Sequence, residues 1–214
     1  MKSGDSDGWI EKEENLSHEC KAWVVHEGKV YDNAEVYDGA GIHDSTQVYG
    51  RAKVYDNALI RDCAKIYYYA QVFDYADVFQ SSQVYDNSKV HGLSGVWGST
   101  KISDSTKVFD YAQVYDSAKV YDNAKIYGHA KVCDFAKVYD AARVYGTAQL
   151  YGQSKVSNAA KVNGEALIGS AIVNSDSSYM VIKKFWSGNP SHPYYLTYTK
   201  SNKRWTEGAG STGG

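Results

Sequence analysis

The feature that most constrains the fold is a six-residue phrase that repeats without interruption over residues 24–167. These 144 residues divide into 24 hexads, and residues 120–125 (Val-Tyr-Asp-Asn-Ala-Lys) are a typical copy. The first position is Val or Ile in 23 of the 24 copies, and the fifth is always Ala, Ser, Thr or Gly. Self-similarity at a short fixed period indicates a repeat architecture rather than a mixed globular core.

Each hexad predicts a short strand followed by a corner. Positions five, six, one and two read small, polar, aliphatic and aromatic, which is the alternation of a strand with one buried and one exposed face. Positions three and four are rich in Asp, Gly, Asn and Ser, which suit a turn. Because the corners share this pattern, the chain must keep turning in one direction. Three hexads per turn give an 18-residue coil, so we expect a three-sided prism of about eight coils with a parallel sheet on each side.

The repeat also carries a resemblance to a known family. Residues 126–130 (Ile-Tyr-Gly-His-Ala) and 144–148 (Val-Tyr-Gly-Thr-Ala) resemble the hexapeptide repeat of left-handed parallel β-helix proteins. The resemblance extends from residue 24 to about residue 172 and implies an all-β, left-handed parallel β-helix. The left hand comes from the family, since the spacing alone does not define it.

The first 23 residues predict a cap. Trp9, Ile10 and Leu16 are the first large apolar residues, and we expect residues 1–23 to cover the open end of a β-helix at residues 24–173. This lead-in is similar to that of a group of uncharacterised hexapeptide proteins of bacteria and their phages, a resemblance that implies no particular activity. The segments that carry the similarity are residues 8–11, 15–17 and 22–24.

The C-terminal part, residues 174–214, predicts a second cap. Residues 179–186 and 194–199 read as strands, and residues 204–206 allow a third. We expect a small antiparallel β cap followed by a flexible tail from Gly208.

Every third hexad lies on the same side of an 18-residue coil, which defines three faces. Face A comprises the hexads that begin at Val24 and at every eighteenth residue up to Leu150; face B begins with Val30 and face C with Val36. The residue before these aliphatic positions is Lys or Arg in six of eight coils on faces B and C, but in one of eight on face A. Surface lysine opposes unwanted association, so its absence from face A favours a contact surface.

Face A and the corner that leads into it also carry an irregular set of apolar residues. We define the apolar strip as seven residues over the middle coils: Leu59, Tyr75, Phe79, Leu93, Trp97, Tyr111 and Tyr115. A contiguous exposed strip is typical of an interface, and ordinary surface variation in a repeat protein is the alternative. The sequence therefore predicts a homo-oligomer or a protein partner through face A.

Faces B and C present columns of lysines beside ladders of aromatic rings. The grid on face B that could bind a polyanion or a glycan consists of Lys101, Lys119, Tyr121, Lys137 and Tyr139. Cations beside aromatic rings suit both kinds of ligand. The simpler interpretation, which we favour, is that the lysines keep the faces soluble while rings ~4.8 Å apart stack on each other.

The sequence offers one weak candidate for catalysis. The best-known relatives of this fold are acyltransferases whose catalytic His lies near a subunit boundary, with help from loops that interrupt the coils. The hexads here have no such interruption, and His43 on face A is the candidate general base. A zinc site of the γ-carbonic anhydrase type needs three converging His, whereas His43, His91 and His129 fall on different faces or corners, several coils apart. We therefore expect no metal and no cofactor.

Two columns of Asp at the corners raise the alternative of calcium binding. Asp at a corner is also simple turn chemistry, which is the interpretation we favour. The columns are Asp38, Asp56 and Asp74 along one edge, and Asp86, Asp104, Asp122 and Asp140 along another.

Net charge and the cysteines limit the expected partners and cellular location of the protein. The formal net charge is −2 and the pI about 6.3, which gives no overall drive toward nucleic acid. Cys20, Cys63 and Cys133 lack a Cys-x-x-Cys spacing and are expected to be free thiols. We find no signal-peptide core and no run of ~20 apolar residues, so we expect a cytoplasmic protein that does not enter the membrane.

Two functions of different classes fit these features. The first is a non-enzymatic β-helical binding scaffold, a phage or bacterial accessory protein that acts through face A by self-association or by binding a host factor. The alternative is an acyl-CoA-dependent hexapeptide acyltransferase with a site between subunits, where His43 would be the base. The oligomeric state bears on both, because transferases of this fold are usually trimers.

Overall fold

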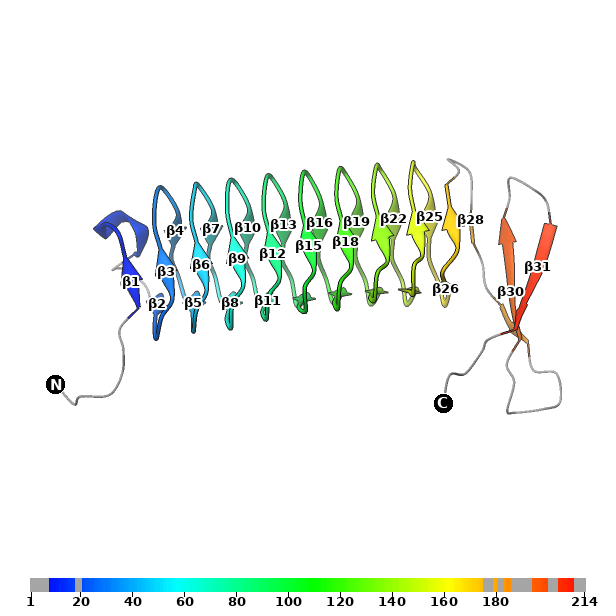
Figure 1. The fold of residues 1–214 in the computed structure, drawn as a ribbon, viewed down its shortest axis with the longest axis horizontal. Helices are drawn as coiled ribbons and strands as arrows, with labels where there is room; N and C mark the ends of the chain where they lie inside the picture. Colours follow the sequence, from blue (N-terminus) through cyan, green and yellow to red (C-terminus); the bar gives the residue numbers. More distant parts are fainter. Residues whose placement is uncertain are drawn as a thin grey trace.

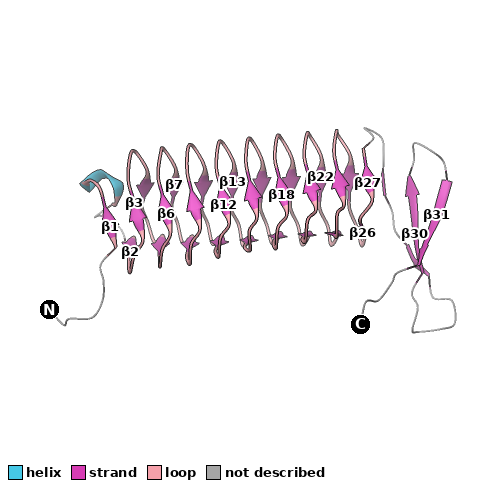
Figure 2. Cartoon of the chain, viewed as in Figure 1, coloured by secondary structure: helices cyan, strands magenta, loops and turns pink. Residues whose placement is uncertain are grey.

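The chain winds into a parallel β-solenoid, the prism that the hexads predict (Figure 1). The computed structural model describes residues 8–17 and 21–174, and beyond them the backbone of four strands: β28 (Tyr179–Met180), β29 (Lys183–Phe185), β30 (Tyr194–Thr199) and β31 (Arg204–Ala209). Apart from one turn of 3-10 helix, η1 (Glu13–Asn15), the described elements are strands (Figure 2).

Three parallel sheets run the length of the solenoid, one on each face. Face B has ten strands in the order β1 (Trp9–Ile10), β3 (Lys29–Val30), β6 (Gln47–Val48), β9 (Lys65–Ile66), β12 (Gln83–Val84), β15 (Lys101–Ile102), β18 (Lys119–Val120), β21 (Lys137–Val138), β24 (Lys155–Val156) and β27 (Ile172–Val173). Face A has nine: β2 (Trp23–Val24), β5 (Gly41–Ile42), β8 (Leu59–Ile60), β11 (Asp77–Val78), β14 (Gly95–Val96), β17 (Gln113–Val114), β20 (Lys131–Val132), β23 (Gln149–Tyr151) and β26 (Leu167–Gly169). Face C also has nine: β4 (Glu35–Val36), β7 (Lys53–Val54), β10 (Gln71–Val72), β13 (Lys89–Val90), β16 (Lys107–Val108), β19 (Lys125–Ile126), β22 (Arg143–Val144), β25 (Lys161–Val162) and β28.

The register confirms the 18-residue coil. Val30 pairs with Val48, and Val120 pairs with Val138, so equivalent hexad positions stack along the axis. The left hand stays the prediction that the family resemblance gives.

The core is a column of aliphatic and small side chains along the axis. The first hexad position is fully buried, as Val48, Ile66 and Val84 show, and the alanines of position five, such as Ala64, are buried beside them. Burying one Val or Ile side chain contributes about 1.5–3 kcal/mol, and each coil supplies three such positions. Stacking of like residues therefore stabilises strands that would be far too short on their own.

The corner Asp residues shape the turn. Asp104 and Asp122 have φ of +56° and +60°, a left-handed conformation that Asp tolerates better than most residues. The Asp104 Oδ2 accepts a hydrogen bond from the Asp122 N–H at 3.2 Å, and the Asp122 Oδ2 accepts one from the Asp140 N–H at 3.0 Å. These carboxylates tie each corner to the next coil, so turn chemistry accounts for them without calcium.

The N-terminal segment extends the solenoid and packs on its first coil. Strand β1 pairs in parallel with β3, while Ile10 and Leu16 lie partly buried against the core. Asn15 is fully buried, and its Nδ2 donates to the carbonyl oxygen of Ala34 at 2.7 Å. Trp9 stays about half exposed, with its ring 6.2 Å from the ring of Tyr31.

The C-terminal strands differ from the prediction in one respect. Residues 179–186 were expected to form one strand of a cap, but β28 pairs in parallel with β25 and so lengthens face C. Only β29, β30 and β31 form an antiparallel sheet. Strand β31 runs to Ala209, so the prediction of a flexible tail from Gly208 was wrong at its start. Residues 210–214 lie outside the described part.

Candidate functional site

The apolar strip lies on face A and on the corner between faces C and A, as predicted. Tyr75, Leu93 and Tyr111 follow one another along this corner and are 63%, 54% and 52% exposed. Phe79, Trp97 and Tyr115 directly follow β11, β14 and β17 on face A, and Leu59 lies on β8. Leu59, Phe79, Trp97 and Tyr115 are partly buried.

Three rings of the strip stack along the axis. The Trp97 ring centroid lies 5.5 Å from that of Phe79 and 4.6 Å from that of Tyr115, with interplanar angles of 12° and 5°. Burial raises the pKa of the Tyr115 hydroxyl to about 12, with a hydrogen bond to Cys133 as a further cause. This hydroxyl therefore stays protonated across the physiological range, and the stack presents no charge.

Glycine makes room for the largest ring. A Cβ placed on Gly95 would lie 3.0 Å from Cζ3 of Trp97, so the indole rests over the backbone of β14. A glycine also makes room for Trp23, which lies on the strand next to Gly41: a Cβ on Gly41 would lie 2.8 Å from Nε1 of Trp23. These contacts have a recognisable pattern in the sequence: a glycine takes the sixth hexad position, where faces B and C mostly carry lysine, and a tryptophan lies nearby on the same face.

Sequence reasoning missed two charged residues that belong to this surface. Arg61 forms a two-point ion pair with Asp77, with 2.7 Å from Nη2 to Oδ2 and 3.2 Å from Nε to Oδ1. The Arg61 guanidinium carbon also lies 4.0 Å from the ring centroid of Phe79. The hydrogen bond to Asp77 raises the pKa of Arg61 further above its already high value. One end of the ring stack is thus closed by a neutralised ion pair.

His43 lies at the first coils of face A, away from the strip. Its Nε2 accepts a hydrogen bond from the Trp23 indole N–H at 2.7 Å, and its ring centroid is 6.4 Å from that of His26. In this arrangement the Nε2 atom of His43 is engaged by the indole of Trp23.

The three histidines considered for zinc do not converge. The His91 ring is stacked between the rings of Phe73 and Phe109, at 4.6 Å and 5.2 Å. His129 stacks on Tyr111 at a corner, 4.7 Å away. Burial lowers the pKa of His91, partly offset by Asp74, so the imidazole is neutral near pH 7 and acts as one more ring of the face C ladder.

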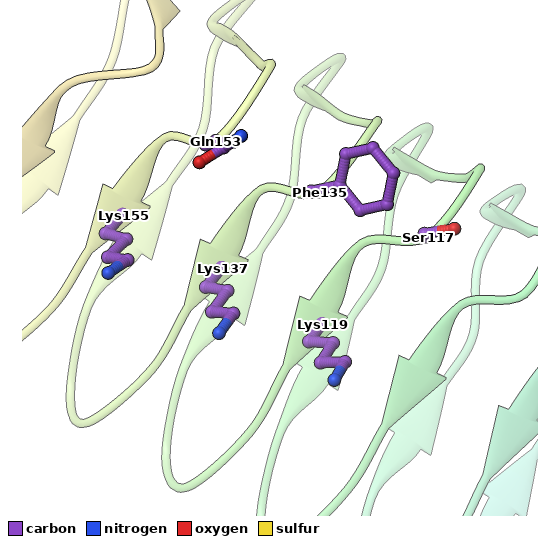
Figure 3. Close-up of a pocket in the computed structure, with 6 residues that line it drawn as sticks. All are labelled: Ser117, Lys119, Phe135, Lys137, Gln153 and Lys155. Carbon is purple, nitrogen blue, oxygen red and sulfur yellow. The ribbon is translucent and has the colours of Figure 1, made fainter.

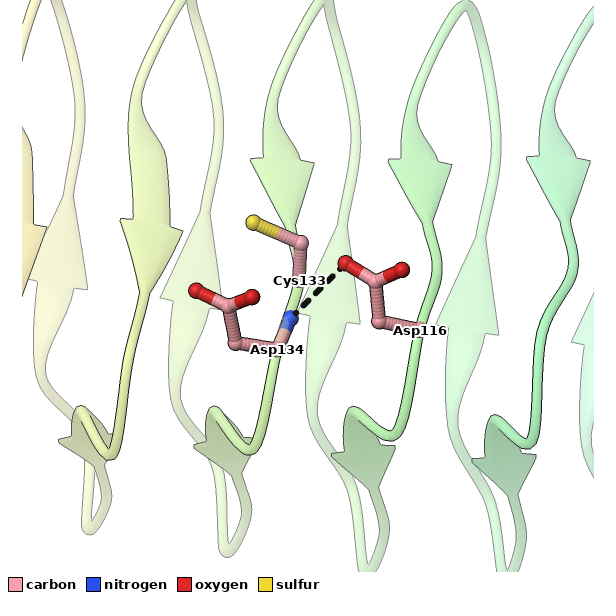
Figure 4. Close-up of side chains that lie close together, drawn as sticks. All are labelled: Asp116, Cys133 and Asp134. Carbon is pink, nitrogen blue, oxygen red and sulfur yellow. Dashed lines mark hydrogen bonds between the residues drawn. The ribbon is translucent and has the colours of Figure 1, made fainter. Parts of the chain in front are cut away.

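One group of potential metal ligands occurs among the described residues: Asp116, Cys133 and Asp134 (Figure 4). Their ligand atoms lie within 4.8 Å of one another. Each is already engaged, because the carboxylates of Asp116 and Asp134 accept backbone N–H bonds at 3.3 Å and 2.7 Å. The Cys133 thiol donates toward the carbonyl oxygen of Leu150 at 3.5 Å, and burial raises its pKa. The two carboxylates therefore stabilise the corner, and the thiol beside them stays protonated.

Cys63 and Cys133 are free thiols, whereas Cys20 lies outside the described residues. Cys63 is exposed at the corner after face A.

The face B grid is arranged as the hexads predict. Lys101, Lys119 and Lys137 are neighbours in register on β15, β18 and β21. Tyr121 and Tyr139 stack at 5.0 Å with an interplanar angle of 5°. Each of these two rings covers one face of the other, and the equivalent positions of the neighbouring coils hold Ser103 and Ser157.

No protein-family model matches this chain, and no curated protein matches it. None of the helices in the described part of the chain is long and apolar enough to cross a membrane.

Proposed function

We propose that this protein is a non-enzymatic, rigid β-helical scaffold that acts by self-association, with the apolar strip of face A as the contact surface and a second copy of the chain as the partner. The observation that carries the proposal is the row of exposed Tyr75, Leu93 and Tyr111 beside the Phe79–Trp97–Tyr115 stack. Large exposed apolar patches rimmed by polar groups are typical of interfaces.

The charge pattern favours a second copy of the chain as the occupant. On faces B and C, lysines from neighbouring strands lie in register, as Lys119 with Lys137 and Lys107 with Lys125. Two copies that met through either face would bring like charges together, which opposes association. Over the strip of face A, the sixth-position residues are instead Leu59, Asp77 and Gly95, and Asp77 is neutralised by Arg61. Face A is therefore the side on which a second copy meets the least repulsion.

The rigidity of the solenoid supports the same proposal. Each coil is fixed by backbone hydrogen bonds to both neighbours, so the strip is held in its exposed arrangement before any partner arrives. A preformed surface loses little conformational entropy on binding. Aromatic residues such as Trp97 and Tyr111 are the types that dominate binding energy at interfaces.

No observation favours the acyltransferase alternative. The Nε2 atom of His43 accepts a hydrogen bond from Trp23, and no loop that could form an acyl-donor site interrupts the coils over residues 24–174.

Two finer proposals accompany this one and rest on the sequence. The hexad pattern and its lead-in support membership of the hexapeptide-repeat group of bacteria and phages. The free thiols of Cys63 and Cys133 support a cytoplasmic location.

Footprinting of tyrosines tests self-association at residue level. Hydroxyl-radical labelling at low and high protein concentration should show Tyr75 and Tyr111 becoming protected as concentration rises. Tyr68 and Tyr69 are matched controls, since they are 54% and 52% exposed on the corner between faces B and C, and their labelling should not change.

Labelling of Tyr75 and Tyr111 that is independent of concentration would overturn the proposal. Protection of Tyr68 and Tyr69 instead would move the contact to another corner. Protection of the strip only after addition of a different protein would replace the second copy with that partner.

A further inference from the structure

A groove lies at the corner between faces A and B, on the opposite edge of face A from Tyr75, Leu93 and Tyr111. It has a volume of about 410 Å³ and is lined by Ser117, Lys119, Phe135, Lys137, Gln153 and Lys155 (Figure 3). The three lysines project side by side from one wall, and Phe135 stands on the other between Ser117 and Gln153. This places cations, an aromatic ring and two hydrogen-bonding side chains around one elongated depression.

The lysine wall is a regular array of positive charges. Lys119, Lys137 and Lys155 lie in register on β18, β21 and β24, so their ammonium groups repeat at about the strand spacing of ~4.8 Å. None of the three forms an ion pair within the described residues. The carboxylates of Asp116 and Asp134, at the same corner as the groove, accept backbone N–H bonds from the next coil. The positive charges of the three lysines are therefore available to an anionic ligand.

Phe135 is unusual among the aromatic residues of the solenoid. It is 63% exposed at a corner position where neighbouring coils carry Ser117 and Gln153. The ladder tyrosines stack on one another, as Tyr121 does on Tyr139, whereas no described ring stacks on Phe135. Its ring is thus available to the apolar face of a ligand.

We propose that this groove binds a linear acidic glycan that lies along the solenoid axis. The lysine array would pair with carboxylates or sulfates that such a chain carries along its length. The Phe135 ring would pack on the C–H face of one sugar, while Ser117 and Gln153 would hydrogen-bond to its hydroxyls. None of the lining residues belongs to the apolar strip, so this proposal does not rest on self-association through face A.

Other polyanions fit the groove less well. A single-stranded nucleic acid is bound by stacking successive bases on successive aromatic side chains, and the groove offers one accessible ring over three coils. An inorganic polyphosphate would use the lysines but would gain nothing from Phe135. The combination of one ring, two small polar groups and a charge repeat points to the glycan.

Calorimetry with a short oligogalacturonate, which has one carboxylate per residue, tests the proposal. The wild-type protein should bind it, and the affinity should fall as salt rises. Lys137→Gln and Phe135→Ser should each weaken binding roughly tenfold, through loss of a charge-assisted bond and of the ring contact. Serine is a natural residue at this corner position, as at Ser117, so Phe135→Ser is expected to fold.

Matched controls keep the result specific. Lys125→Gln removes an equivalent lysine from face C, and Tyr69→Ser removes an exposed ring from another corner; both should leave the affinity within about twofold, since distant charges act only through a screened field. Equal weakening by Lys125→Gln and Lys137→Gln would show diffuse attraction and overturn the site. Equal binding of the neutral methyl ester, or tighter binding of tetraphosphate or oligothymidylate than of the oligogalacturonate, would overturn the ligand class.

Discussion

Arg61 and Asp77 form a two-point ion pair across neighbouring coils of face A, with the guanidinium carbon 4.0 Å from the ring centroid of Phe79. Asp77 occupies the hexad position that holds lysine on most coils of the other two faces. The pair fixes the end of the ring stack and cancels the charge of both residues. It explains how face A can hold ionised groups and still present a surface of low net charge.

This pair should contribute measurably to stability although both side chains are about one-third exposed. A double-mutant cycle of Arg61→Ala and Asp77→Ala, read by urea unfolding, should give a coupling free energy of about 0.5–1 kcal/mol, the upper range for exposed pairs, because the geometry is bidentate. The Lys53 and Glu35 pair makes one contact at 2.8 Å and is more exposed, so its cycle should give less. A larger coupling for Lys53 and Glu35 would contradict this account.

The interior threonines give a second prediction. The hydroxyl of Thr106 is buried with no hydrogen-bond partner in the described structure, whereas that of Thr100 donates to the Trp97 carbonyl at 2.6 Å. Thr106→Val should therefore raise the free energy of unfolding by about 1 kcal/mol, and Thr100→Val should lower it by a similar amount. Chemical denaturation of the two variants checks this, and a loss of stability in Thr106→Val would show that its hydroxyl is satisfied in solution.

The third prediction concerns the Asp residues at the corners. Asp122 combines a φ of +60° with a bond from its Oδ2 to the Asp140 N–H. Asp122→Ala should cost about 1–2 kcal/mol, because it loses the acceptor and strains the backbone. Asp122→Asn keeps both the acceptor and the tolerance for this conformation, so it should cost much less. Thermal unfolding of the two variants separates these contributions, and equal costs would mean that the carboxylate charge matters more than the geometry.

Most of the fold was predictable from the sequence, because the hexad forces one geometry on every coil. The inward aliphatic and small positions, the two-residue corners and the 18-residue turn all follow from residue type at fixed spacing. The C-terminal strands were less predictable. Residues 179–186 contain no hexad, so nothing in them indicates that β28 would join face C while β29 would pair with β30.

The sequence predicts which face each surface residue lies on, but it does not predict which side chains contact one another. The hexads place Leu93 and Trp97 on the right side of the coil, yet they do not reveal that Trp97 lies over Gly95 or that Arg61 reaches Asp77. The groove beside Phe135 was also missed, since the predicted grid paired the lysines with the tyrosine ladder rather than with the opposite corner. Side-chain direction decides these contacts, and the repeat does not encode it.

The tyrosine ladder predicts a loss of stability at high pH. Burial raises the pKa of Tyr67 to about 12, with Tyr85 and Tyr49 as further causes. The folded state therefore holds this proton more tightly than the unfolded state, so the stabilisation is complete below about pH 10 and is lost as pH rises toward 12. Tyr67→Phe removes the titrating group and should lose less stability between about pH 9 and pH 11 than the wild type does. Urea unfolding at these two pH values checks it, and an identical pH dependence in both proteins would contradict the assigned cause.

Sedimentation equilibrium over a range of protein concentrations tests the central proposal most directly. The wild-type chain should reach a mass above that of the 23.7 kDa monomer, and Trp97→Glu and Leu59→Glu should shift it toward the monomer by burying a charge in the contact. Asn123→Glu adds the same charge at an exposed corner between faces B and C and should leave the mass unchanged. A wild-type chain that stays monomeric at every concentration, or a mass that Trp97→Glu and Leu59→Glu do not lower, would contradict self-association through face A.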